Sequence, residues 1–371
     1  MATRRSVLIG ALGASALAAG GGGLWFHVAR GSAGDYEARA RSLRTVFDPE
    51  NAGDRLWAEI VRYATLAANS HNTQAWRFGW DNGDLAITPD GARRTPAVDP
   101  DDHHLYASLG CALENMLLAG QAAGLRLVPR FADGAIRVAL EPAKPATDWL
   151  FDAIPHRQST RGPFDGSTLS AEEQRLLEET PLGGGVEGVV VRLFTDRPAI
   201  AAVRDYVIEG NTRQMADAAF VAELRQWIRF GYGEALRTGD GLFGVASGNP
   251  ALPEALGSLI FSSVFTLDGE TEKYRTQIDG SAAIAVLSAA TDDPAGWVQA
   301  GRAVQRLQLA ATAMGLKTSY INQPVEVAAL RGQFAAWAGL GARRPDLVLR
   351  IGRGAALPYS LRRPVEAVYG G

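Results

Sequence analysis

Apolar positions recur at three- and four-residue spacing over several long stretches of the chain, which is the pattern of helices with one buried face. In residues 55–69, Leu56, Ile60 and Tyr63 fall on one such face, and Asn69 is expected to end this helix. Residues 101–131 predict a long buried helix followed by a strand. Shorter alternating runs at 84–90 and 136–142 predict strands, so the class is α+β.

One helical pattern occurs twice. Tyr106–Leu127 and Trp297–Thr318 share a small-residue start, a polar pair, apolar positions at helical spacing and a final Gly-Leu. The two copies lie about 190 residues apart, too far for a solenoid repeat and about right for two fused copies of one domain. The sequence therefore predicts a dimer written as one polypeptide.

Composition narrows the class of protein. The 371 residues are 47% hydrophobic with a formal charge of -3, which suits a globular protein with a sizeable core and gives no reason to expect a nucleic-acid partner. Cys111 is the single cysteine, so an internal disulfide and a CxxC metal site are excluded, and a buried thiol is expected. The run Asp101-Asp102-His103-His104 is not expected to bind metal, because adjacent helical side chains diverge and both aspartates occupy N-cap positions.

The first 34 residues resemble an export segment. Arg4 and Arg5 precede an apolar run from Val7 to Ala19 that ends in small residues, as in a twin-arginine signal. We therefore expect an exported protein of the periplasm or cell envelope. Cleavage of this segment and its retention as a membrane anchor are both compatible with the sequence.

Two polar stretches are candidates for a binding site. Residues 69–78, NSHNTQAWRF, place hydrogen-bonding side chains in a row directly after an apolar helix. In residues 155–164, Arg157, Ser159 and Arg161 alternate, so an extended backbone would point all three to one side, where they could grip a phosphate. A charged linker between domains explains the second stretch equally well.

Three motifs together resemble the FMN-dependent nitroreductase superfamily. They are R-x-S-x-R from Arg157, N-S-x-N-x-Q-x-W from Asn69, and R-R-P-x-E-x-V from Arg362. The export segment and the fused halves resemble its Acg-like branch, and the resemblance runs from about Tyr36 to the C-terminus. It implies two tandem degenerate nitroreductase-like copies, at 35–150 and 151–371, that form an intramolecular pseudo-dimer.

The resemblance also implies a single FMN site shared by the two halves, because the reciprocal motifs are missing. It assigns no catalytic side chain and no metal; hydride transfer would occur at the flavin N5, beside Asn322 and Gln323, where the family often has Glu-Gly. The cofactor-binding residues implied are Asn69, Ser70, Asn72, Gln74, Arg157, Ser159, Arg161, Asn322, Gln323 and Arg362.

Two functions follow from this assignment. The first is an FMN-dependent oxidoreductase that takes electrons from a small-molecule donor and passes them to a nitro compound, quinone or similar acceptor. The second is a flavin-sequestering protein without turnover. In both, residues at about 227–265, rich in Gly and Pro, are expected to form an irregular lid over the flavin. The protein is expected to be a monomer that meets a membrane only through an uncleaved N-terminal segment.

Overall fold

The computed structural model describes residues 26, 28–81 and 83–370. The predicted export signal from Arg4 to Ala19 lies outside these residues. Within the described part of the chain, none of the helices combines the length and hydrophobicity that a bilayer span needs.

Two antiparallel sheets form the framework. The first has the order β11-β1-β2-β4-β3 and the second the order β5-β8-β10-β9. β11 is the exception in direction, because it pairs parallel with β1. The predicted strands at 84–90, 136–142 and after the long helix are confirmed as β2, β4 and β3. The bounds are β1 (Trp76–Asp81), β2 (Asp84–Pro89), β3 (Leu125–Ala132), β4 (Ala135–Pro142), β5 (Val190–Phe194), β8 (Ala283–Ser288), β9 (Lys317–Tyr320), β10 (Leu347–Gly352) and β11 (Tyr369–Gly370).

The sheets share a connection pattern. Four strands of each sheet follow the order β1-β2-β4-β3 or β5-β8-β10-β9. In chain order, the second of the four strands is followed by a long helix and then by the third strand, which lies at the edge of the sheet. The fourth strand lies between the second and the third. The long helices are α5 (His103–Ala122) and α13 (Pro294–Ala313), both 20 residues. Each is followed by a left-handed glycine, Gly124 or Gly315, which turns the chain into the edge strand.

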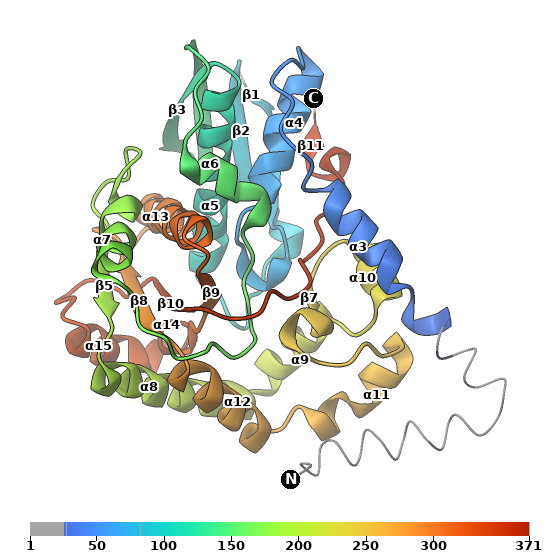
Figure 1. Ribbon diagram of the computed structural model, residues 1–371, viewed down its shortest axis with the longest axis vertical. Helices are drawn as coiled ribbons and strands as arrows, with labels where there is room; N and C mark the ends of the chain where they lie inside the picture. The colour runs from blue at the N-terminus through green and yellow to red at the C-terminus, as the bar shows by residue number, and fades with distance from the viewer. Residues whose placement is uncertain (1–25, 27, 82, 371) are drawn as a thin grey trace.

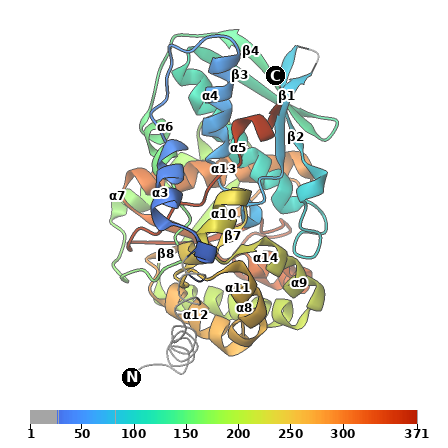
Figure 2. The same cartoon turned by 90° about the vertical axis from the view of Figure 1, so that its right-hand side faces the viewer.

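Helices α5 and α13 pack against each other at the centre of the molecule (Figures 1 and 2). A Cβ atom at Gly110 would collide with the carbonyl of Val298, and one at Gly301 would collide with the carbonyl of Ala107. The two backbones therefore touch at reciprocal positions, which only glycine permits.

The remaining helices cover the sheets. α4 (Asp54–Thr65) and α6 (Trp149–Ala153) pack against α5, while α8 (Arg197–Ala216), α12 (Leu267–Asp279), α14 (Gln323–Glu326) and α15 (Ala328–Trp337) form a layer with the second sheet (Figure 1). α7 (Ala171–Glu179) begins at a capping box. The short 3-10 helices are η1 (Ser70–Asn72), η2 (Gly91–Arg93), η3 (Ile154–His156), η4 (Thr180–Leu182), η5 (Gly244–Ser247) and η6 (Val365–Ala367).

Residues 218–265, here named the cover, are more regular than the sequence predicted. They form α9 (Ala218–Trp227), β6 (Ile228–Arg229), α10 (Tyr232–Thr238), β7 (Leu242–Phe243), η5 and α11 (Glu254–Val264). The expectation of an irregular segment was wrong, because several of its Gly and Pro residues occupy helix caps: Gly231 and Pro253 start helices, and Gly239 ends one at φ 64°.

The N-terminal helix α3 (Ala33–Ser42) supports the cover (Figure 2). The Tyr36 ring stacks on Phe243 with centroids 4.5 Å apart, and its hydroxyl donates to the Tyr359 carbonyl at 2.6 Å. Tyr359 belongs to the C-terminal segment, which runs from the second sheet back to β1 of the first (Figure 1). Both ends of the described chain therefore hold the cover in place.

The close approach of α5 and α13 gives a test. In a helix interior, Ala is normally more favourable than Gly by about 1 kcal/mol. We expect Gly301→Ala to lower the free energy of unfolding by about 1–3 kcal/mol, because the added methyl meets the Ala107 carbonyl. The matched control is Gly332→Ala in α15, where the added Cβ meets open space, so that a small gain is expected. Guanidinium unfolding measures both, and equal effects of the two substitutions would contradict this packing.

Candidate functional site

A cavity of about 1130 Å³ lies between the cover and the rest of the molecule. One wall is polar and comes from the loop after α4, from Arg161, and from α8, α12 and α14. The opposite wall comes from the cover. Of the predicted site residues, the structure places Asn69, Ser70, Arg161, Asn322 and Gln323 on the lining. The other five lie outside it.

The loop after α4 has a strained backbone. His71, Asn72 and Gln74 adopt left-handed φ values of 46°, 53° and 54°. Such conformations cost of order 1–3 kcal/mol each for a residue other than glycine and are found at functional loops. Side chains hold the shape: the Gln74 amide N–H donates to Asn69 Oδ1 at 2.9 Å, and the Ser70 amide N–H donates to Ser108 Oγ at 3.1 Å.

Asn72 and Gln74 point away from the cavity and bind protein backbone. Asn72 Nδ2 donates to the Gly241 carbonyl at 3.1 Å, and Gln74 Nε2 donates to the Gly239 carbonyl at 2.9 Å. Gln74 Oε1 accepts from the Arg363 amide at 2.8 Å. These amides therefore tie the loop to the cover and to the C-terminal segment, and their predicted contact with flavin stays a prediction.

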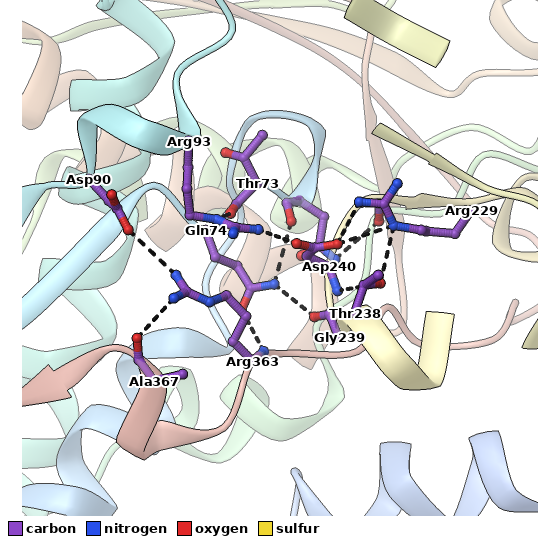
Figure 3. A network of polar contacts seen from close by, with 12 residues as sticks. Thr73, Gln74, Asp90, Arg93, Arg229, Thr238, Gly239, Asp240, Arg363 and Ala367 are labelled. Carbon is purple, nitrogen blue, oxygen red and sulfur yellow. Dashed lines mark hydrogen bonds and ion pairs between the residues drawn. The ribbon is translucent and has the colours of Figure 1, made fainter. Parts of the chain in front are cut away.

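Asp240 extends this connection (Figure 3). Its carboxylate lies between Arg93, which bonds to it directly, and Arg229, whose Nη2 donates at 2.7 Å. Arg93 also donates to the Thr73 carbonyl at 2.5 Å. The turn at 239–241 is thus pinned to the polar loop by a largely buried ion-pair network.

Three guanidinium groups gather beside the polar loop without a carboxylate. Arg157 Nη2 and Arg362 Nη2 both donate to the Leu66 carbonyl, at 3.0 and 3.3 Å, just past the end of α4. Arg44 lies over the Tyr359 ring at 4.2 Å. Burial lowers the pKa of Arg157 and Arg362, and burial followed by repulsion from Arg157 lowers the pKa of Arg44 to about 10.

The R-x-S-x-R stretch runs as an extended segment beside β9. The Thr160 amide donates to the Thr318 carbonyl at 2.8 Å, and Ser159 forms a bridge with Thr318. Arg161 reaches the cavity, whereas Arg157 is buried behind the lining, and its Nε and Nη1 atoms have no hydrogen-bond partner. The alternating spacing predicted that Arg157 and Arg161 point to the same side, and it did not predict that only Arg161 reaches the cavity.

Asn322 and Gln323 lie at the start of α14 on the polar wall. Asn322 Oδ1 accepts from the Val348 amide at 2.8 Å, and Gln323 Nε2 donates to the Tyr274 hydroxyl at 2.6 Å. Gln323 Oε1 is buried without a hydrogen-bond partner. A buried acceptor without a hydrogen bond costs free energy, so this wall suits a ligand with an N–H group that donates to Gln323 Oε1.

The Nitroreductase family model matches residues 154–353. The chain belongs to the nitroreductase family. It is 26% identical over 325 residues to "Putative NAD(P)H nitroreductase Rv3131" of Mycobacterium tuberculosis H37Rv, covering 83% of this chain and 89% of that protein. It is also 26% identical over 330 residues to "Putative NAD(P)H nitroreductase acg" of the same strain, covering 83% and 93%.

Solved structures with this fold include two nitroreductases. One is a nitroreductase with bound FMN from Desulfitobacterium hafniense, at 12% identity and a TM-score of 0.38, covering 61% of this chain and 100% of that one. Another is the FMN-dependent nitroreductase NfnB from Mycobacterium smegmatis in complex with NADPH, at 15% identity and a TM-score of 0.36, covering 56% and 87%. The family match, together with the helices and antiparallel sheets described above, confirms the α+β nitroreductase-like class predicted from the sequence.

This nitroreductase-family chain also brings an acid–base group to the cavity that the motifs did not reveal. His104 Nε2 lies 3.5 Å from Glu326 Oε1, and Gln214 Nε2 donates to Glu326 Oε2 at 2.6 Å. Burial raises the pKa of Glu326, while burial, followed by the neighbouring His103, lowers the pKa of His104 to about 3. No sequence signal links these residues, because α5 and α14 meet only in the folded chain.

The Asp101–His104 run behaves only partly as predicted. The two histidines do diverge, with His103 bonded to Asp346 and His104 facing Glu326. Asp102 occupies the N-cap position of α5, as predicted, whereas Asp101 does not. The Asp102 side chain makes no cap bond, and the Asp99 carboxylate instead accepts from the His104 and Leu105 amides at 3.0 and 2.9 Å. A tight turn at residues 99–102 brings the Asp99 carboxylate to the start of α5, although Asp99 lies three residues before the N-cap.

Cys111 is buried, as predicted. Its Sγ donates to the Gly301 carbonyl at 3.2 Å across the α5–α13 contact. Burial raises the pKa of the thiol to about 12, so it stays protonated at neutral pH and is not a nucleophile.

The buried pair of His103 and Asp346 predicts a pH dependence. Their closest atoms are 2.8 Å apart, and burial raises the pKa of Asp346 from 3.8 to about 7. A raised pKa means that the folded state holds the proton more tightly, so this contribution to stability is full below pH 3.8 and is lost as the pH rises through about 7.

We therefore expect Asp346→Asn, which keeps an amide in place of the carboxyl, to flatten the fall in stability between about pH 5 and 8 by on the order of 2 kcal/mol. Thermal unfolding of both proteins across that range measures it. His103 has its pKa lowered to about 3 and stays neutral in the same range. An unchanged slope in the variant would assign the pH dependence to other groups.

Proposed function

We propose that this protein is an FMN-dependent oxidoreductase of nitroreductase type that passes electrons to a nitro compound, quinone or similar acceptor. The observation that carries the proposal is a cavity with a polar wall from both halves of the chain, next to buried cations that lack carboxylates. The family membership and the relatives named NAD(P)H nitroreductases support it.

The residues present fit FMN. A phosphate carries about -1.5 to -2 charges near neutral pH and would offset the repulsion among Arg44, Arg157 and Arg362. The unused Nε and Nη1 atoms of Arg157 are donors, and Gln323 Oε1 is an acceptor for a ring N–H. Bound FMN would supply the two-electron chemistry, while the protein supplies binding, orientation and electrostatics.

The chain's own groups then divide the work. Asn69, Ser70 and Arg161 line the polar wall, where they would hold and orient the ring system of FMN. Burial raises the pKa of Glu326, and its carboxyl group lies at the cavity surface, where it is placed to exchange a proton with a reduced acceptor. The cover lies over this region, and exclusion of water by it would strengthen each of these electrostatic interactions.

We further propose that the chain is a fused pseudo-dimer of halves 35–150 and 151–371 with one FMN, active as a monomer and exported through its N-terminal segment. The equal strand orders of the two sheets and the reciprocal contacts at Gly110 and Gly301 support the duplication. Lid movement of residues 227–265 stays a prediction. A flavin-sequestering role is favoured by one observation, the buried network that pins the cover at Asp240.

Flavin content tests the binding assignment. We expect the parent protein to purify with one FMN per 39.4 kDa chain and Arg157→Ala/Arg161→Ala to purify without it, because the double variant loses a buried cation and the cation that reaches the cavity. Arg175→Ala, on the exposed face of α7, is the matched control and should keep its flavin. A folded double variant with full flavin, or two flavins in the parent, contradicts the site.

Anaerobic reduction separates catalysis from sequestration. The yellow protein is mixed with NADPH, and with dithionite as a positive control, while the flavin absorbance is followed. An oxidoreductase is expected to bleach within seconds at millimolar NADPH and to recover its colour when a quinone or nitro compound is added. Bleaching by dithionite alone, with no response to any common biological donor, favours sequestration.

A further inference from the structure

The cavity is larger than one cofactor requires. Sites that enclose a drug-sized ligand have volumes of about 300–1,000 Å³, and FMN is a ligand of about that size. The volume of about 1130 Å³ therefore leaves room beside FMN on the polar wall. The unassigned space lies against the cover.

The cover contributes no charged side chain to the lining. Its apolar contributors include Phe220, Leu224, Phe230, Leu252, Leu256 and Ile260. On the same lining, Phe261 stacks on Phe265 with centroids 4.9 Å apart. Among the described lining residues, the Lys and Arg side chains are Arg30, Arg161 and Lys273, all outside the cover. A long uncharged chain fits such a surface, whereas the phosphates of a dinucleotide would need cations along it.

A polar atom without a partner lies on the same lining. Asn211 of α8 is 5% exposed, and its Nδ2 has no hydrogen-bond partner. A buried donor left unpaired costs about 1–3 kcal/mol, and a carbonyl oxygen would satisfy it. The second ligand therefore has a carbonyl-bearing head and an apolar tail.

We infer that the second occupant of this cavity is a quinone with a long alkyl or isoprenoid chain, or its quinol form. The inference rests on the proposed oxidoreductase function, which requires the occupant to be redox-active. Asn211 donates to a ring carbonyl, and the chain lies along the apolar wall formed by Leu256 and Ile260, which are one helical turn apart on α11.

Calorimetric titration of the protein as purified tests the inference with two benzoquinones, one bearing only methyl and methoxy groups and one bearing a decyl chain as well. Burial of the chain predicts at least about 100-fold tighter binding of the decyl compound. Decylbenzene, which has the tail and a ring but no acceptor oxygen, should bind at least about tenfold more weakly than the decyl quinone, because it cannot accept from Asn211 Nδ2. Equal affinities of the two quinones, or decylbenzene as tight as the decyl quinone, would overturn the assignment.

Variants of one helix locate the tail. Ile260→Glu places a charge on the lining and should remove most of the chain-length preference, while leaving the short quinone unaffected. Leu259→Glu is the matched control, because Leu259 is the next residue and is 79% exposed. If Ile260→Glu does not fold, Leu256→Ser on the same helix face replaces it. This variant is expected to bind the decyl quinone about tenfold or more weakly than the parent. Parent-like binding of the decyl quinone by the folded lining variant refutes the inference.

A third variant separates the head from the tail. Asn211→Ala should weaken both quinones by the same factor, about tenfold, and leave decylbenzene, which has no acceptor oxygen, unchanged. Flavin absorbance is recorded for every preparation. Absence of flavin from the parent would refute the proposed function. The preference for the decyl quinone is measured by calorimetry, so it tests the second ligand independently of the flavin content.

Discussion

The contact between α5 and α13 is the constraint on which the other features depend. Where Gly110 and Gly301 let the two backbones touch, buried amides run outward from the crossing. Gln305 Nε2 donates to Asn115 Oδ1 at 2.7 Å, and Gln305 Oε1 accepts from the Ala68 amide at 3.2 Å. The helix crossing thus holds Ala68, directly before the polar loop at residues 69–74. A looser crossing would move this wall of the cavity.

Buried charge is the second constraint. Arg157 and Arg362 are held by carbonyls just past the end of α4, where a helix carries partial negative charge, which offsets part of their desolvation. The offset is incomplete, because Arg157 keeps two unpaired nitrogen atoms. By contrast, Glu114 is paired with both Arg302 and Arg306, at 3.0 and 2.7 Å, so the chain satisfies buried arginines where no ligand is needed. The difference supports an anion beside the polar loop.

The two walls of the cavity have opposite chemistry for a structural reason. The polar wall consists of helix ends and a strained loop, where backbone and side-chain groups face the ligand. The cover presents the apolar faces of α9 and α11, and its charged residues Arg229 and Asp240 bond to each other away from the lining. One ligand that is charged and one that is apolar can therefore lie side by side without exchanging walls.

The sequence by itself determined the α+β class, the helices α4, α5 and α13, the strands β2, β3 and β4, and the segments that carry the site, because periodicity and short motifs are local properties. It also placed Cys111 in the core. It did not determine which members of each motif reach the cavity: Asn69 and Arg161 do, whereas Asn72, Gln74 and Arg157 turn to the protein interior. Nor did it reveal the His104–Glu326 pair or the role of Asp240. The His104–Glu326 and Arg93–Asp240 contacts join residues more than 100 positions apart, and their geometry exists only once α5 and α13 have packed and the cover lies against the loop.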